Sequence, residues 1–224
     1  EQKSWFPIDY HGGINSSVWK EKILEHWLAY KFLNLNEWVT HEKYIDVAAA
    51  NSPWALELRK NLDIKAYAID LQKPTEKFAE YDFYMQQNAV KTSFKGNSIK
   101  GISLQCAYEM FEGDDDFNFI KELNRILCVG GKAIILPLYM HTHYCCYSSP
   151  EYYGKNYSPA EAKEYISYDV RGIRSSRKYD VPALKKRILN QIESLDMRYK
   201  IHKLKNKNKI NNSIYCHFIL EIIK

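Results

Sequence analysis

Long apolar runs are absent from this 224-residue chain, as is the basic-then-apolar start of a secretory signal. No segment approaches the roughly 20 apolar residues that a membrane-spanning helix requires. Hydrophobic residues make up 46% of the chain and charged residues 26%, which are ordinary values for a globular protein and favour neither a disordered nor a fibrous class. We therefore expect a soluble, cytoplasmic protein without a membrane span, folded as one domain.

Cysteine is sparse and shows no framework spacing. The five cysteines are odd in number and include no CxxC pair, which favours reduced thiols over disulfides. Cys145 and Cys146 are adjacent. His141 and His143 flank a threonine, and no clear third metal ligand lies beside them in the sequence. We therefore expect no metal site.

Acidic residues are scarce in the C-terminal part of the chain. From residue 171 onward there are 14 Lys and Arg against 4 Asp and Glu, so residues 1–170 are net acidic. This asymmetry is compatible with an anionic partner or with a solvated basic surface. The basic residues lack the stacking-aromatic pattern of a known RNA motif, so nucleic acid is not the expected partner.

Strand-like and helical segments alternate over residues 44–139. Strands are expected at 44–49, 65–71, 82–86, 98–106 and 132–139, and helices at 18–34, 53–60 and 114–127. We take Ser17 as the cap of the first helix, and Gly130 with Gly131 as the end of the third. The alternation predicts an α/β fold, a Rossmann-like, mostly parallel sheet with helices on both faces. A helix at 181–195 and a C-terminal antiparallel strand pair at 197–204 and 213–223 complete it.

Polar residues follow successive strands in a fixed order. Asp46 and Asp70 end the first two strands, QNA at 87–89 follows the third, and ELNRILCVGGKAIILPLY closes the series. This order resembles the class I S-adenosylmethionine-dependent methyltransferases over about residues 40–140. The resemblance implies S-adenosyl-L-methionine as cofactor. By matching positions, Asp46 and the backbone of 48–52 face its methionine part, Asp70 takes the ribose hydroxyls and Asn88 contacts the adenine. The implied cofactor-binding residues are Asp46, Ala48, Ala50, Ser52, Asp70, Leu71, Asn88, Ala89 and Gln105.

The loop after the first strand contains no glycine, unlike the family's usual loop. Ala48, Ala50 and Ser52 stand in the usual glycine places, and Asn51 tolerates left-handed geometry better than most residues. We expect a working loop in which the alanines have negative φ, so that glycine there would not tighten cofactor binding.

Two further stretches resemble a bacterial methyltransferase subgroup associated with surface-polysaccharide genes. They are CAYEMFEGD at 106–114 and LPLY at 136–139, alongside the IDVAAANSP loop. The chain departs from this subgroup at Met110, where the pattern has His. The resemblance implies O-methylation of a sugar or phosphoryl group in a capsule or surface-polysaccharide precursor.

On this interpretation, residues 1–40 are an N-terminal helical segment, 41–140 the cofactor-binding core, 141–180 an acceptor-side insertion and 181–224 the C-terminal helix and strand pair. The aperiodic insertion is where a specificity element is expected. The candidate catalytic bases are His143, His141 and Glu109. The candidate contacts to an anionic or sugar-containing small-molecule acceptor are Tyr144, Arg171, Arg174, Arg177 and Tyr179. Two alternatives stay open, an RNA-binding methyltransferase-like module and an inactive scaffold of the same fold.

Overall fold

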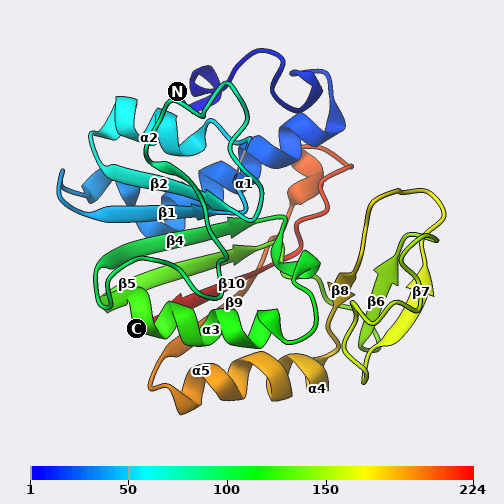
Figure 1. Cartoon of the computed structure of the whole chain (residues 1–224). Coiled ribbons are helices and arrows are strands. Elements are labelled where there is room, and N and C mark those ends of the chain that lie inside the picture. Colours follow the sequence, from blue (N-terminus) through cyan, green and yellow to red (C-terminus); the bar gives the residue numbers. More distant parts are fainter. Residues whose placement is uncertain (1, 50) are drawn as a thin grey trace.

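A seven-stranded sheet forms the centre of the molecule (Figure 1). The computed structural model describes residues 2–49 and 51–224. In order across the sheet, the strands are β3 (Tyr84–Gln86), β2 (Lys65–Asp70), β1 (Lys43–Val47), β4 (Ile99–Gln105), β5 (Leu127–Leu136), β10 (Phe218–Ile223) and β9 (Arg198–Lys203). Strands β1 to β5 run parallel, while β10 is antiparallel to both β5 and β9. This arrangement confirms the predicted α/β fold and the C-terminal antiparallel pair.

Helices cover both faces of the sheet and bury a separate apolar layer on each. Helices α1 (Ser17–Leu33) and α2 (Trp54–Leu62) lie on one face, above the sheet in Figure 1. Helix α3 (Asp115–Ile126) lies on the other face, with a helix made of α4 (Val181–Leu184), a π-helical turn η5 (Lys185–Leu189) and α5 (Asn190–Ser194).

Ser16 caps α1, one residue before the expected Ser17, because its Oγ accepts from Val18 N at 3.2 Å. Within the described ranges, no helix combines the length and apolar character needed to cross a membrane.

Short 3-10 turns complete the main body. They are η1 (Gln2–Trp5), η2 (Tyr10–Gly12), η3 (Leu35–Glu37), η4 (Tyr108–Met110) and η6 (Lys207–Lys209). Two of them position the site described below. Turn η2 brings the N-terminal segment against α1, and η4 directly follows β4.

The glycine pair at 130 and 131 does not end α3, contrary to the sequence-based prediction. Helix α3 ends at Ile126 and β5 begins at Leu127, so both glycines lie inside β5. The register with β4 shifts there, and Gly130 has φ +77°. A Cβ on Gly131 would lie 2.8 Å from the Cys128 carbonyl oxygen. The glycines therefore serve a bulge in the strand, where the backbone needs positive φ and close approach.

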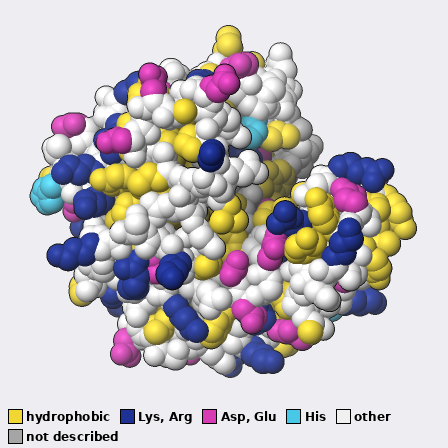
Figure 2. Space-filling model, in the orientation of Figure 1, with side chains coloured by type: hydrophobic (Ala, Val, Ile, Leu, Met, Phe, Trp, Pro, Cys, Tyr) yellow, Lys and Arg dark blue, Asp and Glu magenta, His cyan; other side chains and the backbone are white. Residues whose placement is uncertain are grey.

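Residues 145–178 contain a second, three-stranded sheet where the sequence predicted an aperiodic stretch. Strand β6 (Cys145–Ser148) lies between β7 (Lys163–Ile166), with which it is parallel, and β8 (Ser176–Lys178), with which it is antiparallel. Parallel strands need a long connection, so β6 and β7 are not joined by a hairpin turn. Such a turn is the usual sequence signal of a strand pair. This lobe projects from the right of the main body, and Figure 2 shows the surface hollowed between the two.

A buried ion cluster ties the lobe to α3. Asp116 of α3 and Arg177 of β8 are fully buried and ion-paired, and Arg187 Nη2 lies 2.7 Å from Asp116 Oδ1. Tyr179 donates its hydroxyl to Asp116 Oδ2 at 2.6 Å, and Arg177 Nη2 donates to Gly113 O at 2.6 Å. These contacts explain why Arg177 and Tyr179 are inside the protein. Neither side chain is accessible to an acceptor in this structure, which corrects the two predicted substrate contacts.

Candidate active site

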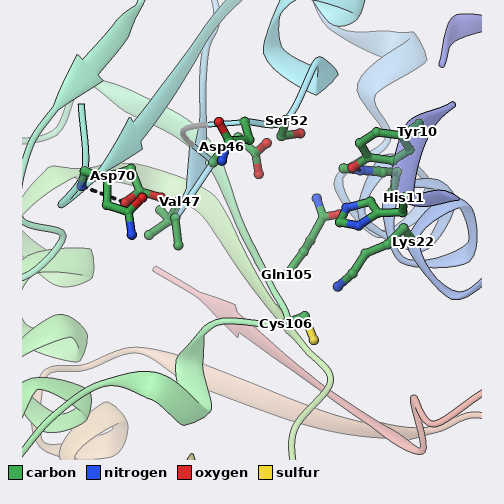
Figure 3. A pocket seen from close by; sticks show the side chains of 14 residues that line it. Tyr10, His11, Lys22, Asp46, Val47, Ser52, Asp70, Gln105 and Cys106 are labelled. Atoms are coloured by element: carbon green, nitrogen blue, oxygen red, sulfur yellow. Dashed lines mark hydrogen bonds between the residues drawn. The ribbon is translucent and has the colours of Figure 1, made fainter. Parts of the chain in front are cut away.

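A cavity of about 620 Å³ opens at the carboxyl ends of β1 and β4, with Tyr10, His11 and Lys22 on the opposite side from Asp46 and Asp70 (Figure 3). Parallel α/β sheets bind ligands at this edge. The cavity is lined by Tyr10, His11, Lys22, His26, Asp46, Val47, Ala48, Ala49, Asn51, Ser52, Asp70, Gln72, Gln105 and Cys106. Five of the nine predicted cofactor-binding residues are in this set, although their positions in the sequence span almost 60 residues.

A second hollow of about 230 Å³ adjoins the first at Val47, Ala48 and Asp70, which line both. Its walls include the remaining described members of the predicted set, Leu71, Asn88 and Ala89, together with Met110, Glu112 and Arg174. The two hollows therefore form one elongated site that passes the ends of β1, β2 and β3. Ala50 lies outside the described residues.

Backbone and side-chain hydrogen bonds fix the glycine-free loop between β1 and α2. Ala49 N donates to Ile69 O at 3.1 Å, which ties the loop to the end of β2. Ser52 Oγ accepts from Trp54 N at 3.2 Å, and Tyr84 donates its hydroxyl to Ser52 O at 2.5 Å. Ala48 has φ +60°, so the expectation of negative φ is wrong at this position. The loop keeps the left-handed backbone for which glycine is usually selected, with an alanine in its place.

Ala48→Gly should therefore stabilise the protein by about 0.5 to 1 kcal/mol. Left-handed geometry costs an L-residue about 1 to 2 kcal/mol, and the greater entropy of unfolded glycine offsets about 0.5 to 1 kcal/mol of that gain. Ala49→Gly is the matched control, because Ala49 is buried and is not among the positive-φ residues of the described chain. Urea unfolding should show a gain for the first variant and a loss for the second. A loss at both positions would show that Ala48 is not strained.

Asp46 and Gln105 present unpaired acceptor atoms to the cavity. Asp46 is 2% exposed, and neither its Oδ2 nor Gln105 Oε1 has a hydrogen-bond partner within residues 2–49 and 51–224. Burial raises the pKa of Asp46 to about 7. Leaving such groups buried and unpaired is costly unless a ligand supplies donors. The arrangement fits a cationic group with N–H donors, bound at the end of β1.

Asp70 and Asn88 shape the turns that border the second hollow. Asp70 Oδ1 accepts from Gln72 N at 2.8 Å, and Asn88 Oδ1 accepts from Val90 N at 3.0 Å. Leu71, between these turns, is 68% exposed and offers an apolar surface beside them. An acidic group at the end of β2 next to such a surface has the geometry used to hold a ribose and its base.

The N-terminal segment supplies site residues that sequence reasoning missed. Tyr10, His11, Lys22 and His26 line the cavity, and Tyr10 Oη lies 2.9 Å from His26 Nε2. Burial holds the pKa of His26 well below its ordinary value, so the ring is neutral. One signal was available: Lys22, Glu25 and His26 recur at helical spacing on the otherwise apolar face of α1.

The two histidines predicted as bases do not line the cavity. His143 Nε2 lies 2.8 Å from the Tyr165 hydroxyl of the lobe, and His141 N donates to Tyr179 O at 2.7 Å. Donor atoms of His141, His143 and Cys145 fall within 4.8 Å of one another, a grouping the sequence did not predict. The third candidate base, Glu109, is 8% exposed and lies beside the cavity-lining Cys106.

The remaining acceptor candidates are distributed over the lobe. Arg171 is exposed and pairs with Glu151 at 3.5 Å. Arg174 pairs with Glu112 at 3.1 Å on the wall of the second hollow, which makes it the one predicted arginine at the site. Tyr144 is buried and stacks on Tyr179 with ring centroids 5.8 Å apart, so it belongs to the packing around the ion cluster.

No protein-family model matches this sequence, and neither does the sequence of any curated protein. The structure, however, is similar to solved methyltransferases. One is the 1,6-didemethyltoxoflavin-N1-methyltransferase of Burkholderia thailandensis with bound 1,6-didemethyltoxoflavin and S-adenosylhomocysteine. The TM-score is 0.60 at 11% identity, over 96% of this chain and 84% of that one.

Two further structures give similar values. An S-adenosylmethionine-dependent methyltransferase from Archaeoglobus fulgidus matches with a TM-score of 0.57 and 14% identity over 100% of both chains. The geranyl diphosphate C-methyltransferase of Streptomyces coelicolor, in complex with Mg²⁺, geranyl diphosphate and S-adenosyl-L-homocysteine, matches with a TM-score of 0.53 and 11% identity. The match covers 97% of this chain and 87% of that one. At these identities the matches establish the fold, which is the Rossmann-like fold of class I methyltransferases.

Proposed function

We propose that this protein is an S-adenosylmethionine-dependent methyltransferase acting on a small molecule. The observation that carries the proposal is Asp46, a buried carboxylate with an unpaired oxygen at the end of β1, inside a cavity of suitable size. The structural neighbours share the fold, and two of them hold S-adenosylhomocysteine. When bound, the cofactor supplies a methyl group activated by an adjacent sulfonium.

The residues present fit this cofactor part by part. Asp46 Oδ2 and Gln105 Oε1 would accept from the methionine ammonium, which satisfies both orphaned atoms. Asp70 would accept from the ribose hydroxyls, with Leu71 and Asn88 beside the base in the second hollow. Methyl transfer from a sulfonium releases a neutral thioether, so the protein has mainly to position the two reactants and exclude water.

The sequence resemblance extends the proposal to the acceptor, a sugar-containing precursor of a bacterial capsule or surface polysaccharide. The charges near the cavity limit that choice. Of the basic residues near the cavity, Lys22 pairs with Glu25, Arg174 pairs with Glu112 and Arg177 is buried against Asp116. A neutral or cationic acceptor is therefore favoured over a phosphorylated one.

Calorimetry with S-adenosylhomocysteine tests the proposal and separates it from the two alternatives. Binding is expected. If millimolar ligand gave no heat and no thermal shift, the result would favour the inactive-scaffold alternative.

For the RNA alternative, binding of a fluorescent single-stranded RNA should be measured at two salt concentrations, because phosphate contacts make affinity strongly salt-dependent. Figure 2 shows Lys and Arg scattered over the visible face among acidic and neutral side chains, so we expect weak RNA binding.

A further inference from the structure

Six residues form a second polar group at the end of the cavity, around the cysteine that follows β4. This Cys106 cluster consists of Lys22, Glu25, Cys106, Glu109, Tyr139 and Tyr215. Lys22 Nζ lies 2.8 Å from Glu25 Oε2 and also contacts the Cys106 thiol. Glu109 hydrogen-bonds the same thiol from turn η4. Lys22 and Cys106 line the cavity, and each of them is a partner of one of the two glutamates.

Both glutamates of the cluster carry an oxygen without a partner. Glu25 Oε1 and Glu109 Oε2 make no hydrogen bond to any described residue, although Glu25 is fully buried and Glu109 is 8% exposed. The nearby Glu21 differs, because its two oxygens accept from Tyr215 N and Cys216 N at 2.9 and 3.0 Å. Backbone N–H groups thus satisfy both carboxylate oxygens of Glu21, whereas each of the two cluster glutamates keeps one oxygen without a hydrogen bond among the described residues. Such atoms have a physical reason to persist when a ligand provides the donors.

Two tyrosines complete the cluster on the other side of the Cys106 thiol. The hydroxyls of Tyr139 and Tyr215 lie 3.7 and 3.5 Å from Cys106 Sγ, and their rings stack with centroids 6.4 Å apart. Both side chains are half-buried. Carboxylates next to aromatic faces are the combination that recognises an organic ammonium, through charge and through the ring quadrupole.

We propose that the Cys106 cluster is the acceptor subsite, that the methylated group is an amine, and that Glu109 accepts the proton which the ammonium form must lose. This inference rests on the proposed function, since it specifies the acceptor of the same reaction. A sugar-containing acceptor stays compatible with it when the reacting group is an amino group.

The chemistry requires one proton transfer and one substitution. The bound ammonium gives a proton to the Glu109 carboxylate, which leaves a neutral amine with a free electron pair. That nitrogen attacks the methyl carbon, the new C–N bond forms as the C–S bond breaks, and the bonding electrons remain on sulfur. The products are a methylated ammonium and a neutral thioether, so charge and atoms balance.

Glu109 is better suited to the proton transfer than Glu25. Lys22 already pairs with Glu25, whereas Glu109 forms no ion pair within residues 2–49 and 51–224. Burial raises the pKa of Glu109 to about 7, so this carboxyl can be ionised and can also hold a proton near neutral pH. The other titratable groups that face it are Lys22 and Glu25 from α1, Cys106, and Tyr139.

The test is ligand-observed NMR on protein saturated with S-adenosylhomocysteine. The probes are primary amines, alcohols and phosphate monoesters built on the same carbon skeletons. We expect amines to bind preferentially and to bind at least tenfold more weakly to Glu109→Gln. Glu76→Gln, a change at an exposed site away from the cavity, should bind them as the parent protein does. Glu109→Gln should also raise the melting temperature of the ligand-free protein, because it removes a carboxyl whose ionised form is disfavoured by burial.

Calorimetry with S-adenosylhomocysteine separates failure of this inference from failure of the proposed function. Loss of cofactor-product binding in the parent protein would reject both. If S-adenosylhomocysteine still binds, three results would overturn the amine assignment alone. They are equal affinity for alcohols or phosphates, no binding of amines, and amine binding that Glu109→Gln does not change. A melting temperature lowered by Glu109→Gln would give Glu109 a structural role instead.

Discussion

Asp116→Asn should lower the free energy of unfolding by about 3 to 5 kcal/mol, because it leaves the fully buried Arg177 without a counterion. Asparagine keeps the size of the side chain and can still accept from Tyr179, so the loss reports the charge rather than a cavity. Urea unfolding at pH 7 measures it. Since Arg177 belongs to β8, the lobe should become the first part of the protein to exchange its amide hydrogens.

Asp114→Asn provides the control for this change. Asp114 pairs with Arg187 at 2.9 Å, but its side chain is 73% exposed, so we expect a change within about 0.5 kcal/mol. If Asp114→Asn and Asp116→Asn lowered the free energy of unfolding equally, burial of the Asp116 ion pair would not explain the loss.

The destabilisation by Asp116→Asn should depend on pH. Burial alone would raise the pKa of Asp116, but hydrogen bonds from Arg187 and the charge of Arg177 hold it below its ordinary value. A carboxyl with a depressed native pKa contributes stability above its unfolded pKa of about 3.9, and that contribution disappears as pH falls through the native pKa. The difference between Asp116→Asn and the parent protein should therefore shrink below about pH 4. A constant difference from pH 7 to pH 3 would argue against an ionised Asp116.

Asp70→Ala should weaken S-adenosylhomocysteine binding by about 1.5 to 3 kcal/mol, the usual contribution of hydrogen bonds to a charged group. The carboxylate lines both hollows and is placed to bind the two ribose hydroxyls. Calorimetry measures the loss directly. Asp70→Asn is the sharper variant, because it retains an Oδ1 acceptor for Gln72 N and so preserves the turn after β2.

Asp82→Ala is the matched control for Asp70, since it removes an exposed acid from the segment before β3 that lines neither hollow. Its affinity should equal that of the parent protein. If Asp70→Asn bound as tightly as Asp82→Ala, the acid at the end of β2 would serve only the turn.

Local patterns were sufficient to predict the core of this fold. Alternating apolar strands and amphipathic helices predict the sheet because each element must bury one face, and helix α3 buries Phe119, Ile120, Leu123 and Ile126 as its spacing requires. Strand ends likewise place Asp46 and Asp70 at one edge, since parallel strands share a direction. The glycines of β5 were misassigned because a bulge and a helix end use the same backbone freedom.

The order of the strand-end residues is visible in the sequence, and it predicted the part of the cavity lining around Asp46, Asp70 and Gln105. The lining contributed by the N-terminal segment and α1 became visible only in the folded protein. The helical spacing of Lys22 and Glu25 marks a polar stripe on α1, but no local pattern indicates that this stripe meets Glu109 around Cys106. Arg177 has the sequence context of a surface loop and becomes fully buried because Asp116, 61 residues earlier, neutralises it. Local spacing encodes which face of an element is apolar, whereas pairing of buried charges depends on which faces meet.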